Sequence, residues 1–134
     1  MSRVTAFDAD VLIYAGAPGH PMGAGIVRAT ERDRGIGSQL LLPEVLSKPT
    51  RTEPGSAVVA ELTRLLSRLE LLPVDREVAQ LSVTLGAKYG LRAADAVHLA
   101  TAITAGADRF LTNNRKDFGD RISEIDVVHP DELR

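Results

Sequence analysis

The amino-acid sequence predicts an α/β fold, a three-layer α/β/α sandwich built on a central, mostly parallel sheet of four to five strands. Short runs rich in β-branched, aromatic or leucine side chains alternate with longer segments in which apolar residues recur every three or four positions. The connections are long enough to hold the helices that parallel strands require. The chain has 134 residues, 44% of them hydrophobic and 25% charged, and is expected to form one domain, 1–134, with its own core.

Short apolar segments are expected to form the strands. The first, residues 4–7, has the sequence Val-Thr-Ala-Phe and ends at Asp8, as expected for a buried strand that leads into a functional turn. A later candidate contains Pro73, which weakens it as a strand. The expected strands are residues 4–7, 39–42, 71–74, 109–112 and 125–128. Because helical segments separate them, we expect parallel strands with helices on both faces of the sheet.

Helices are expected between these strands. The most clearly delimited one is capped by Asp75 and ends before Gly90. Another begins at Pro54 and has valine and leucine residues at spacings of three and four. The expected helices are residues 20–34, 54–69, 75–89 and 93–105, with Gly35 after the first and Gly106 after the last. Pro43 opens a further segment that contains Glu44.

The composition limits where the protein is expected to act. The chain has no Cys, so it can form neither a disulfide nor a thiolate metal site, and a reducing cytoplasm is its natural setting. Its longest uncharged stretch, residues 11–27, contains two prolines and four glycines, so we expect no membrane-spanning helix there. The formal net charge of −2 gives no overall basic field for nucleic acid, although metal ions bound to clustered acids would offset part of that charge.

Acidic and amide side chains follow several of the expected strands. Asp8 and Asp10 come after the first strand, and Glu44 comes after the second. The side chains after the fourth strand are Asn113, Asn114 and Asp117. Because the carboxyl ends of parallel strands meet at one edge of a sheet, where ligands bind, we expect these side chains to lie close together.

Asp95 lies at the start of an expected helix and shares a helical face with Leu99, Ala102 and Ile103. Its carboxylate is therefore expected to point inward, which is costly unless the group is paired or binds a metal ion. The helix N-terminus would help to keep the carboxylate ionised. No Lys or Arg shares that face, so a metal ion and an ion pair are equally open explanations.

Convergence of Asp8, Glu44, Asp95 and Asp117 would require a positive partner. Two carboxylates about 4 Å apart repel by about 4 kcal/mol at an effective dielectric constant of about 20. Mg²⁺ or Mn²⁺, which prefer oxygen ligands, would relieve that repulsion. Such an ion lowers the pKa of its bound water and helps to position that water for attack on a phosphodiester.

Four sequence segments are distinctive. They are Phe-Asp-Ala-Asp-Val-Leu-Ile at 7–13, Leu-Leu-Pro-Glu-Val at 41–45, Leu-Arg-Ala-Ala-Asp-Ala-Val-His-Leu-Ala-Thr-Ala at 91–102, and Leu-Thr-Asn-Asn-Arg-Lys-Asp-Phe at 111–118. In this order and at these separations, the sequence resembles the PIN-domain family, in particular the VapC-type toxins of bacterial toxin–antitoxin pairs. The third segment is the most specific of the four.

The resemblance implies a metal site and its ligands. Asp8, Glu44 and Asp95 correspond to catalytic acids that hold Mg²⁺ or Mn²⁺. The fourth acidic position corresponds to Asn114, with Asp117 three residues further on, so either residue is a candidate ligand and the number of ions stays open. Further candidates for supporting the site or contacting RNA, all close to these acids in the sequence, are Asp10, Thr112, Arg92, Arg115 and Lys116.

The resemblance also implies a function and partners. It implies a metal-dependent endoribonuclease whose substrate is tRNA, rRNA or mRNA, together with a homodimer and a cognate antitoxin that covers the site. Apolar residues in 58–69 and 78–89 independently favour a homodimer, because they are too numerous for so small a sheet to cover. His98, on a largely apolar helix, is interpreted as a core or interface histidine rather than as a catalytic one.

Two alternatives remain at this point. The chain could be a non-catalytic PIN-like module whose acids bind a basic partner. It could also be a phosphatase of the haloacid dehalogenase type with Asp8 as the nucleophile, since Asp8-Ala9-Asp10-Val11 follows a strand. The acidic residues after Gly119-Asp120 fit that second family poorly.

Overall fold

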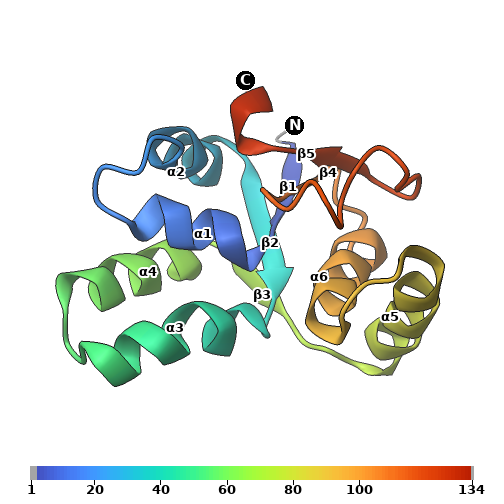
Figure 1. Cartoon of the computed structure of the whole chain (residues 1–134), viewed down its shortest axis with the longest axis horizontal. Coiled ribbons are helices and arrows are strands. Elements are labelled where there is room, and N and C mark those ends of the chain that lie inside the picture. Colours follow the sequence, from blue (N-terminus) through green and yellow to red (C-terminus); the bar gives the residue numbers. More distant parts are fainter. Residues whose placement is uncertain (1–2, 134) are drawn as a thin grey trace.

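The computed structural model describes residues 3–133 and has a five-stranded sheet at its centre (Figure 1). The strands are β1 (Val4–Phe7), β2 (Arg34–Ser38), β3 (Glu70–Leu72), β4 (Arg109–Leu111) and β5 (Asp126–Val128). Their order across the sheet is β3-β2-β1-β4-β5, and all four neighbouring pairs are parallel. The parallel sheet of the predicted fold is therefore confirmed. Residues 1, 2 and 134 of the expected domain lie outside the described residues.

Six α-helices cover the two faces of this sheet (Figure 1). They are α1 (Ala9–Gly16), α2 (Gly23–Arg32), α3 (Leu41–Thr52), α4 (Ala57–Ser67), α5 (Arg76–Tyr89) and α6 (Ala93–Thr104), and a 3₁₀ turn follows at Pro130–Glu132. Helices α1 to α4 lie on one side and α5 and α6 on the other, which confirms the three-layer sandwich. Among residues 3–133, no helix is both long and apolar enough to cross a bilayer.

The core has two parts, one on each face of the sheet. Neighbouring residues of a strand point to opposite faces, so Ala6 and Phe110 pack with α5 and α6, whereas Phe7 and Leu111 pack with α1 to α4. Phe110 also contacts Phe118 edge to face, with ring centroids 5.1 Å apart. The central strands β1 and β4 are therefore buried from both sides, and the residues directly after them are held in place by the core.

The second strand lies earlier than predicted. Residues 39–42 form a turn and the start of α3, and β2 occupies residues 34–38, where the sequence indicated the end of a helix. The physical reason is the close approach of neighbouring side chains. A Cβ on Gly35 would lie 2.4 Å from Leu69 Cδ2, and a Cβ on Gly37 would lie 2.4 Å from Leu41 Cδ1. The glycines serve packing here, and Glu44 consequently lies on the first turn of α3 rather than after a strand.

The other boundaries agree better with the sequence. Asp75 caps α5 by accepting a hydrogen bond from the Val78 amide at 2.9 Å, and Gly90 ends the helix with a φ of 66°. The apolar run after Asp8 forms α1, a helix that was not predicted. The predicted surplus of apolar side chains on α4 is absent, because Leu62, Leu65 and Leu66 are all buried within the described fold.

Candidate active site

Asp8 joins the ends of two central strands. It follows β1, and its amide donates to the Leu111 carbonyl oxygen of β4 at 3.0 Å. One carboxylate oxygen, Oδ1, caps α1 by accepting from the Ala9 amide, and the other, Oδ2, accepts from the Thr112 hydroxyl, both at 2.8 Å. Asp8 is only 5% exposed. Its carboxylate is therefore fixed by two segments of the chain, the start of α1 and the residue after β4.

Asp10 lies in the first turn of α1, beside Asp8. Its Oδ2 atom accepts a hydrogen bond from the Asn113 amide at 3.1 Å. Its Oδ1 atom is buried and has no hydrogen-bond partner among residues 3–133. A buried carboxylate oxygen without a partner is costly, and functional sites are where such atoms are retained.

Glu44 reaches the same region from α3 and contacts His98 of α6. His98 Nε2 lies in hydrogen-bond contact with Glu44 Oε1, and the imidazole is almost completely buried. The core position expected for His98 is therefore correct. Sequence analysis missed that the same ring also touches an acidic site residue, although its position one turn after Asp95 was a usable signal.

Asp95 lies in the first turn of α6. None of the residues in 3–133 donates a hydrogen bond to its carboxylate or forms an ion pair with it. Of the two explanations that the sequence left open, the ion pair therefore has no partner within the described chain. With Asp10 and Glu44, Asp95 also places three acids on the first turns of three helices, whose positive dipole ends favour carboxylates.

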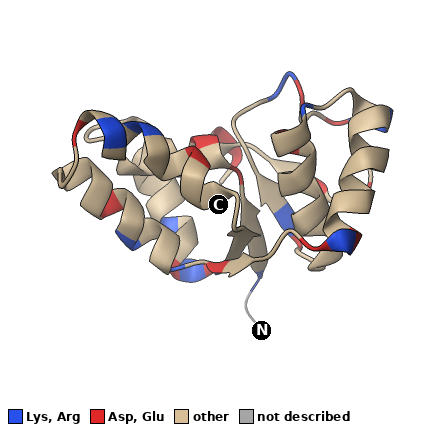
Figure 2. Cartoon of the chain, turned by 90° about the horizontal axis from the view of Figure 1, so that it is seen from below, with Lys and Arg blue, Asp and Glu red and all other residues tan. Residues whose placement is uncertain are grey.

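These acids line one small pocket of about 250 Å³. The lining residues are Asp8, Ala9, Asp10, Ile13, Glu44, Asp95 and Asn114. The pocket lies at the carboxyl edge of β1 and β4, where the sequence predicted it. In Figure 2, acidic segments gather near the middle of the molecule, between the two helical layers. Four separate parts of the chain thus contribute acidic or amide oxygens to one place.

The loop after β4 brings Asn114 and Asp117 together. The Asn114 side-chain amide donates to Asp117 Oδ2 at 2.9 Å, and the Asp117 backbone amide donates to Asn114 Oδ1 at 3.1 Å. Asn114 lines the pocket, whereas Asp117 is not among its lining residues. The Asp117 charge nevertheless raises the pKa of Asp95. Asn114 therefore lines the pocket, and Asp117 is hydrogen-bonded to it without lining the pocket itself.

Burial and mutual repulsion raise the pKa of three of these acids. Desolvation is the main cause for each of them. For Asp10 it acts together with the Asp8 charge and raises the pKa to about 6. For Asp95, the charges of Asp8, Asp117 and Glu44 add to desolvation. The pocket therefore gathers carboxylates whose burial and mutual repulsion disfavour their ionised forms.

Replacing Asp10 by Asn is expected to stabilise the metal-free protein near pH 7. The pKa of Asp10 is raised to about 6, so the folded state disfavours the ionised form at higher pH, and the penalty disappears as pH falls through that value. We expect a gain on the order of 1–3 kcal/mol at pH 7 that shrinks toward about pH 5. Urea unfolding in EDTA measures it. Exposed Asp126→Asn is the control, and an Asp10→Asn advantage that is independent of pH would contradict the expectation.

The basic candidates surround the acidic residues in the sequence but differ in their surroundings. Arg92 is exposed at the start of α6, and Lys116 is exposed in the loop after β4. Arg115 forms an ion pair with Asp131. Within the described residues, Arg92 and Lys116 are therefore the two of these three basic side chains that have no ion-pair partner.

The donor set fits a hard divalent cation by its chemistry. The pocket offers carboxylate and amide oxygens, and one buried oxygen of Asp10 lacks a partner. Among residues 3–133, no three His or acidic side chains are already placed to hold one ion. The residues thus supply suitable ligand types, which a bound ion would have to draw together.

Comparisons with solved structures agree with this fold. A toxin–antitoxin complex from Klebsiella pneumoniae is similar with a TM-score of 0.72 and 24% identity, covering 94% of this chain and 97% of that one. VapBC2 from Rickettsia felis, bound to a promoter DNA fragment, is similar with a TM-score of 0.75 and 18% identity, covering 94% of this chain and 98% of that one. The sarcin-ricin loop cleaving toxin VapC20 from Mycobacterium tuberculosis has a TM-score of 0.63 and 15% identity, covering 79% of this chain and 86% of that one.

Sequence comparisons extend this similarity to a family. Curated protein sequences give no significant match. The family model described as the PIN domain, however, matches residues 6–123, a range that contains every acid of the pocket. This match includes the β1 and β4 ends that hold Asp8 and the helix that carries Asp95. On this match and on its parallel five-stranded fold, the chain belongs to the PIN domain family.

Proposed function

We propose that this protein is a metal-dependent endoribonuclease that acts as the toxin of a toxin–antitoxin pair. The observation that carries the proposal is the pocket itself, where acids from β1–α1, α3 and α6 meet, and where burial raises the pKa of Asp8 and Asp95. Membership of the PIN family supports a nuclease over the phosphatase alternative. The similar structures include toxin–antitoxin complexes and a toxin that cleaves the sarcin-ricin loop of RNA.

Asp8, Glu44, Asp95 and Asn114 are the proposed ligands, with Asp117 supplying charge behind Asn114. Mg²⁺ or Mn²⁺ bound there would lower the pKa of a water molecule and stabilise charge on a phosphodiester. Repulsion among the acids favours binding of a cation, because the ion relieves a cost already present in the folded protein.

The chain's own residues position these groups. The Thr112 hydroxyl and the Ala9 amide hold both oxygens of Asp8, and His98 holds Glu44 against α6. Asn113 holds one oxygen of Asp10. The exposed side chains of Arg92 and Lys116, close in sequence to Asp95 and Asn114, are the proposed contacts for RNA phosphates. The proposed site thus combines acids held by hydrogen bonds with exposed basic side chains that can contact phosphates.

The proposed partners are RNA, a second copy of the chain and an antitoxin. Because the leucines of α4 are buried, a homodimer would have to use other surfaces, such as α5 with its Val83, which is 72% exposed. An antitoxin would restrain the nuclease in the cytoplasm, where its RNA substrate is found.

The test is cleavage of a panel of tRNA, rRNA and mRNA fragments in Mg²⁺, in Mn²⁺ and in EDTA. We expect discrete cleavage products with at least one metal and none in EDTA. Expression of the chain alone should arrest bacterial growth. RNA binding without cleavage in either metal would favour the non-catalytic module, and normal growth with soluble protein present would contradict the toxin assignment.

A further inference from the structure

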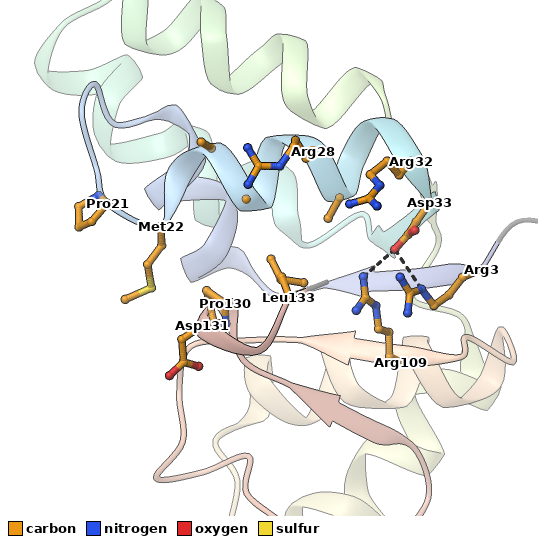
Figure 3. A pocket seen from close by; sticks show the side chains of 13 residues that line it. Arg3, Pro21, Met22, Arg28, Arg32, Asp33, Arg109, Pro130, Asp131 and Leu133 are labelled. Atoms are coloured by element: carbon orange, nitrogen blue, oxygen red, sulfur yellow. Dashed lines mark hydrogen bonds and ion pairs between the residues drawn. The ribbon is translucent and has the colours of Figure 1, made fainter.

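A second pocket lies at the opposite edge of the sheet from the acidic one. It has a volume of about 470 Å³ and is formed by α2, the amino ends of β1 and β4, and the C-terminal turn (Figure 3). From its charge and shape, we propose that this pocket binds a nucleoside monophosphate. The proposal concerns a site separate from the acidic pocket, because no residue lines both.

The pocket carries an excess of positive charge. Four arginines line it, and the acidic lining residues are Asp33 and Asp131. Asp33 already pairs with Arg109 at 2.8 Å and with Arg3 at 3.6 Å, and Asp131 pairs with Arg115 outside the pocket. Arg28 and Arg32, one helical turn apart on α2, have no ion-pair partner within residues 3–133. Two guanidinium groups are therefore available to an anion.

The cationic end of the pocket has a rigid floor. The Arg109 side chain is only 8% exposed. Its Nε donates to the Thr5 hydroxyl at 2.9 Å and its Nη2 donates to Asp33 at 2.8 Å, while Thr5 donates to Asp33 at 2.6 Å. This network fixes the guanidinium before any ligand arrives. A pre-organised arginine loses little side-chain entropy when it binds a phosphate.

The two ends of the pocket differ in chemistry. Figure 3 shows Pro21 and Met22 at one end, with Asp131 beside them, and Arg32, Asp33 and Arg109 at the other, with Arg28 between the two ends. Arginine binds phosphate oxygens in pairs and also stacks on planar rings. A ligand with a phosphate at one end and a flat, largely apolar base at the other matches this arrangement, and the volume falls in the usual range of roughly 300–1,000 Å³ for small-ligand sites.

The test measures binding of adenosine monophosphate by calorimetry in EDTA, with inorganic phosphate and adenosine as separate probes. We expect the mononucleotide to bind at least about tenfold more tightly than either fragment, because only it contacts both ends. Arg28→Gln/Arg32→Gln is expected to weaken binding by about a hundredfold, since each charge-assisted hydrogen bond is worth about tenfold or more. Arg51→Gln/Arg76→Gln, which removes two exposed arginines from α3 and α5, is the charge-matched control.

A second variant blocks the space and keeps every charge. A Cβ on Gly25 would lie 3.7 Å from Leu133 Cδ1 and 3.9 Å from Arg28 Nη2, and both residues line the pocket. Gly25→Leu is therefore expected to abolish nucleotide binding while the protein stays folded. Asp95→Asn, in the other pocket, should bind the nucleotide like the parent. Inorganic phosphate binding as tightly as the nucleotide, or nucleotide binding that survives either α2 variant, would overturn the proposal.

Discussion

Asp95→Asn is expected to remove nearly all RNA cleavage while leaving the metal-free protein at least as stable as the parent. The carboxylate makes no hydrogen bond or ion pair with residues 3–133, so the substitution breaks no such contact within the described chain. It removes a charge that Asp8, Asp117 and Glu44 repel. Changes to groups that merely support metal ligands cost roughly 10–100-fold, so loss of a ligand should exceed about a hundredfold.

The matched control is Asp75→Ala, which removes a carboxylate that caps α5. It should cost about 1 kcal/mol of stability and leave cleavage per folded molecule unchanged. Single-turnover cleavage in Mg²⁺ and urea unfolding in EDTA give the two readouts. Parental cleavage by Asp95→Asn, or a clear loss of its metal-free stability, would show that Asp95 is a structural residue.

Asp33→Asn is expected to destabilise the fold by about 3 kcal/mol, lowering the Tm by about 10 °C. Asp33 is the carboxylate partner of Arg109, and both side chains are less than a tenth exposed. Removing one partner leaves a buried charge without compensation. Glu70→Gln, which breaks the half-exposed ion pair between Arg34 and Glu70, is the control and should cost no more than about 1 kcal/mol.

Lowering the pH is expected to remove a stabilising contribution of Asp33, whereas it removes a destabilising contribution of Asp10. Its partners, Thr5 and Arg109, hold the pKa of Asp33 below its usual range despite burial. The stabilisation is therefore present above the ordinary aspartate pKa and disappears as pH falls through the lowered value. The difference in the free energy of unfolding between the parent and Asp33→Asn should become smaller below about pH 4. A double variant, Asp33→Asn/Arg109→Met, should recover much of the loss, and failure to do so would contradict the isolated-charge explanation.

Much of the fold follows from local patterns in the sequence. Helix α5 has a capping Asp75, apolar periodicity and a terminal glycine that all agree, α6 is followed by Gly106, and the structure has both helices where expected. Strand β2 was not predicted at its observed position, because Gly35 and Gly37 have low strand propensity. In the sheet, Leu69 and Leu41 lie so close to Gly35 and Gly37 that a larger residue would require these leucine side chains to shift. No window of sequence around residue 36 contains that information.

The acids that gather in the pocket were easier to predict from the sequence than some of the helices and strands that carry them. Asp8, Glu44 and Asp95 were singled out from residue type and motif, and all three line the pocket even though Glu44 stands on a helix rather than after a strand. The Glu44–His98 contact and the hydrogen bond from the Asn113 amide to Asp10 depend on tertiary placement, so the sequence did not predict them. The same holds for Arg109, which looks like an ordinary strand residue in the sequence and forms a buried network with Asp33.

The distribution of the site along the chain has a consequence for synthesis on the ribosome. The Thr112 hydroxyl that holds the Asp8 carboxylate, and the Asn114 that completes the pocket wall, are made more than a hundred residues after Asp8. Strand β4, which pairs with β1, arrives just before them. A nascent chain therefore carries no complete pocket until residues 112–114 have left the ribosome, so the proposed nuclease activity would begin only after that point in synthesis.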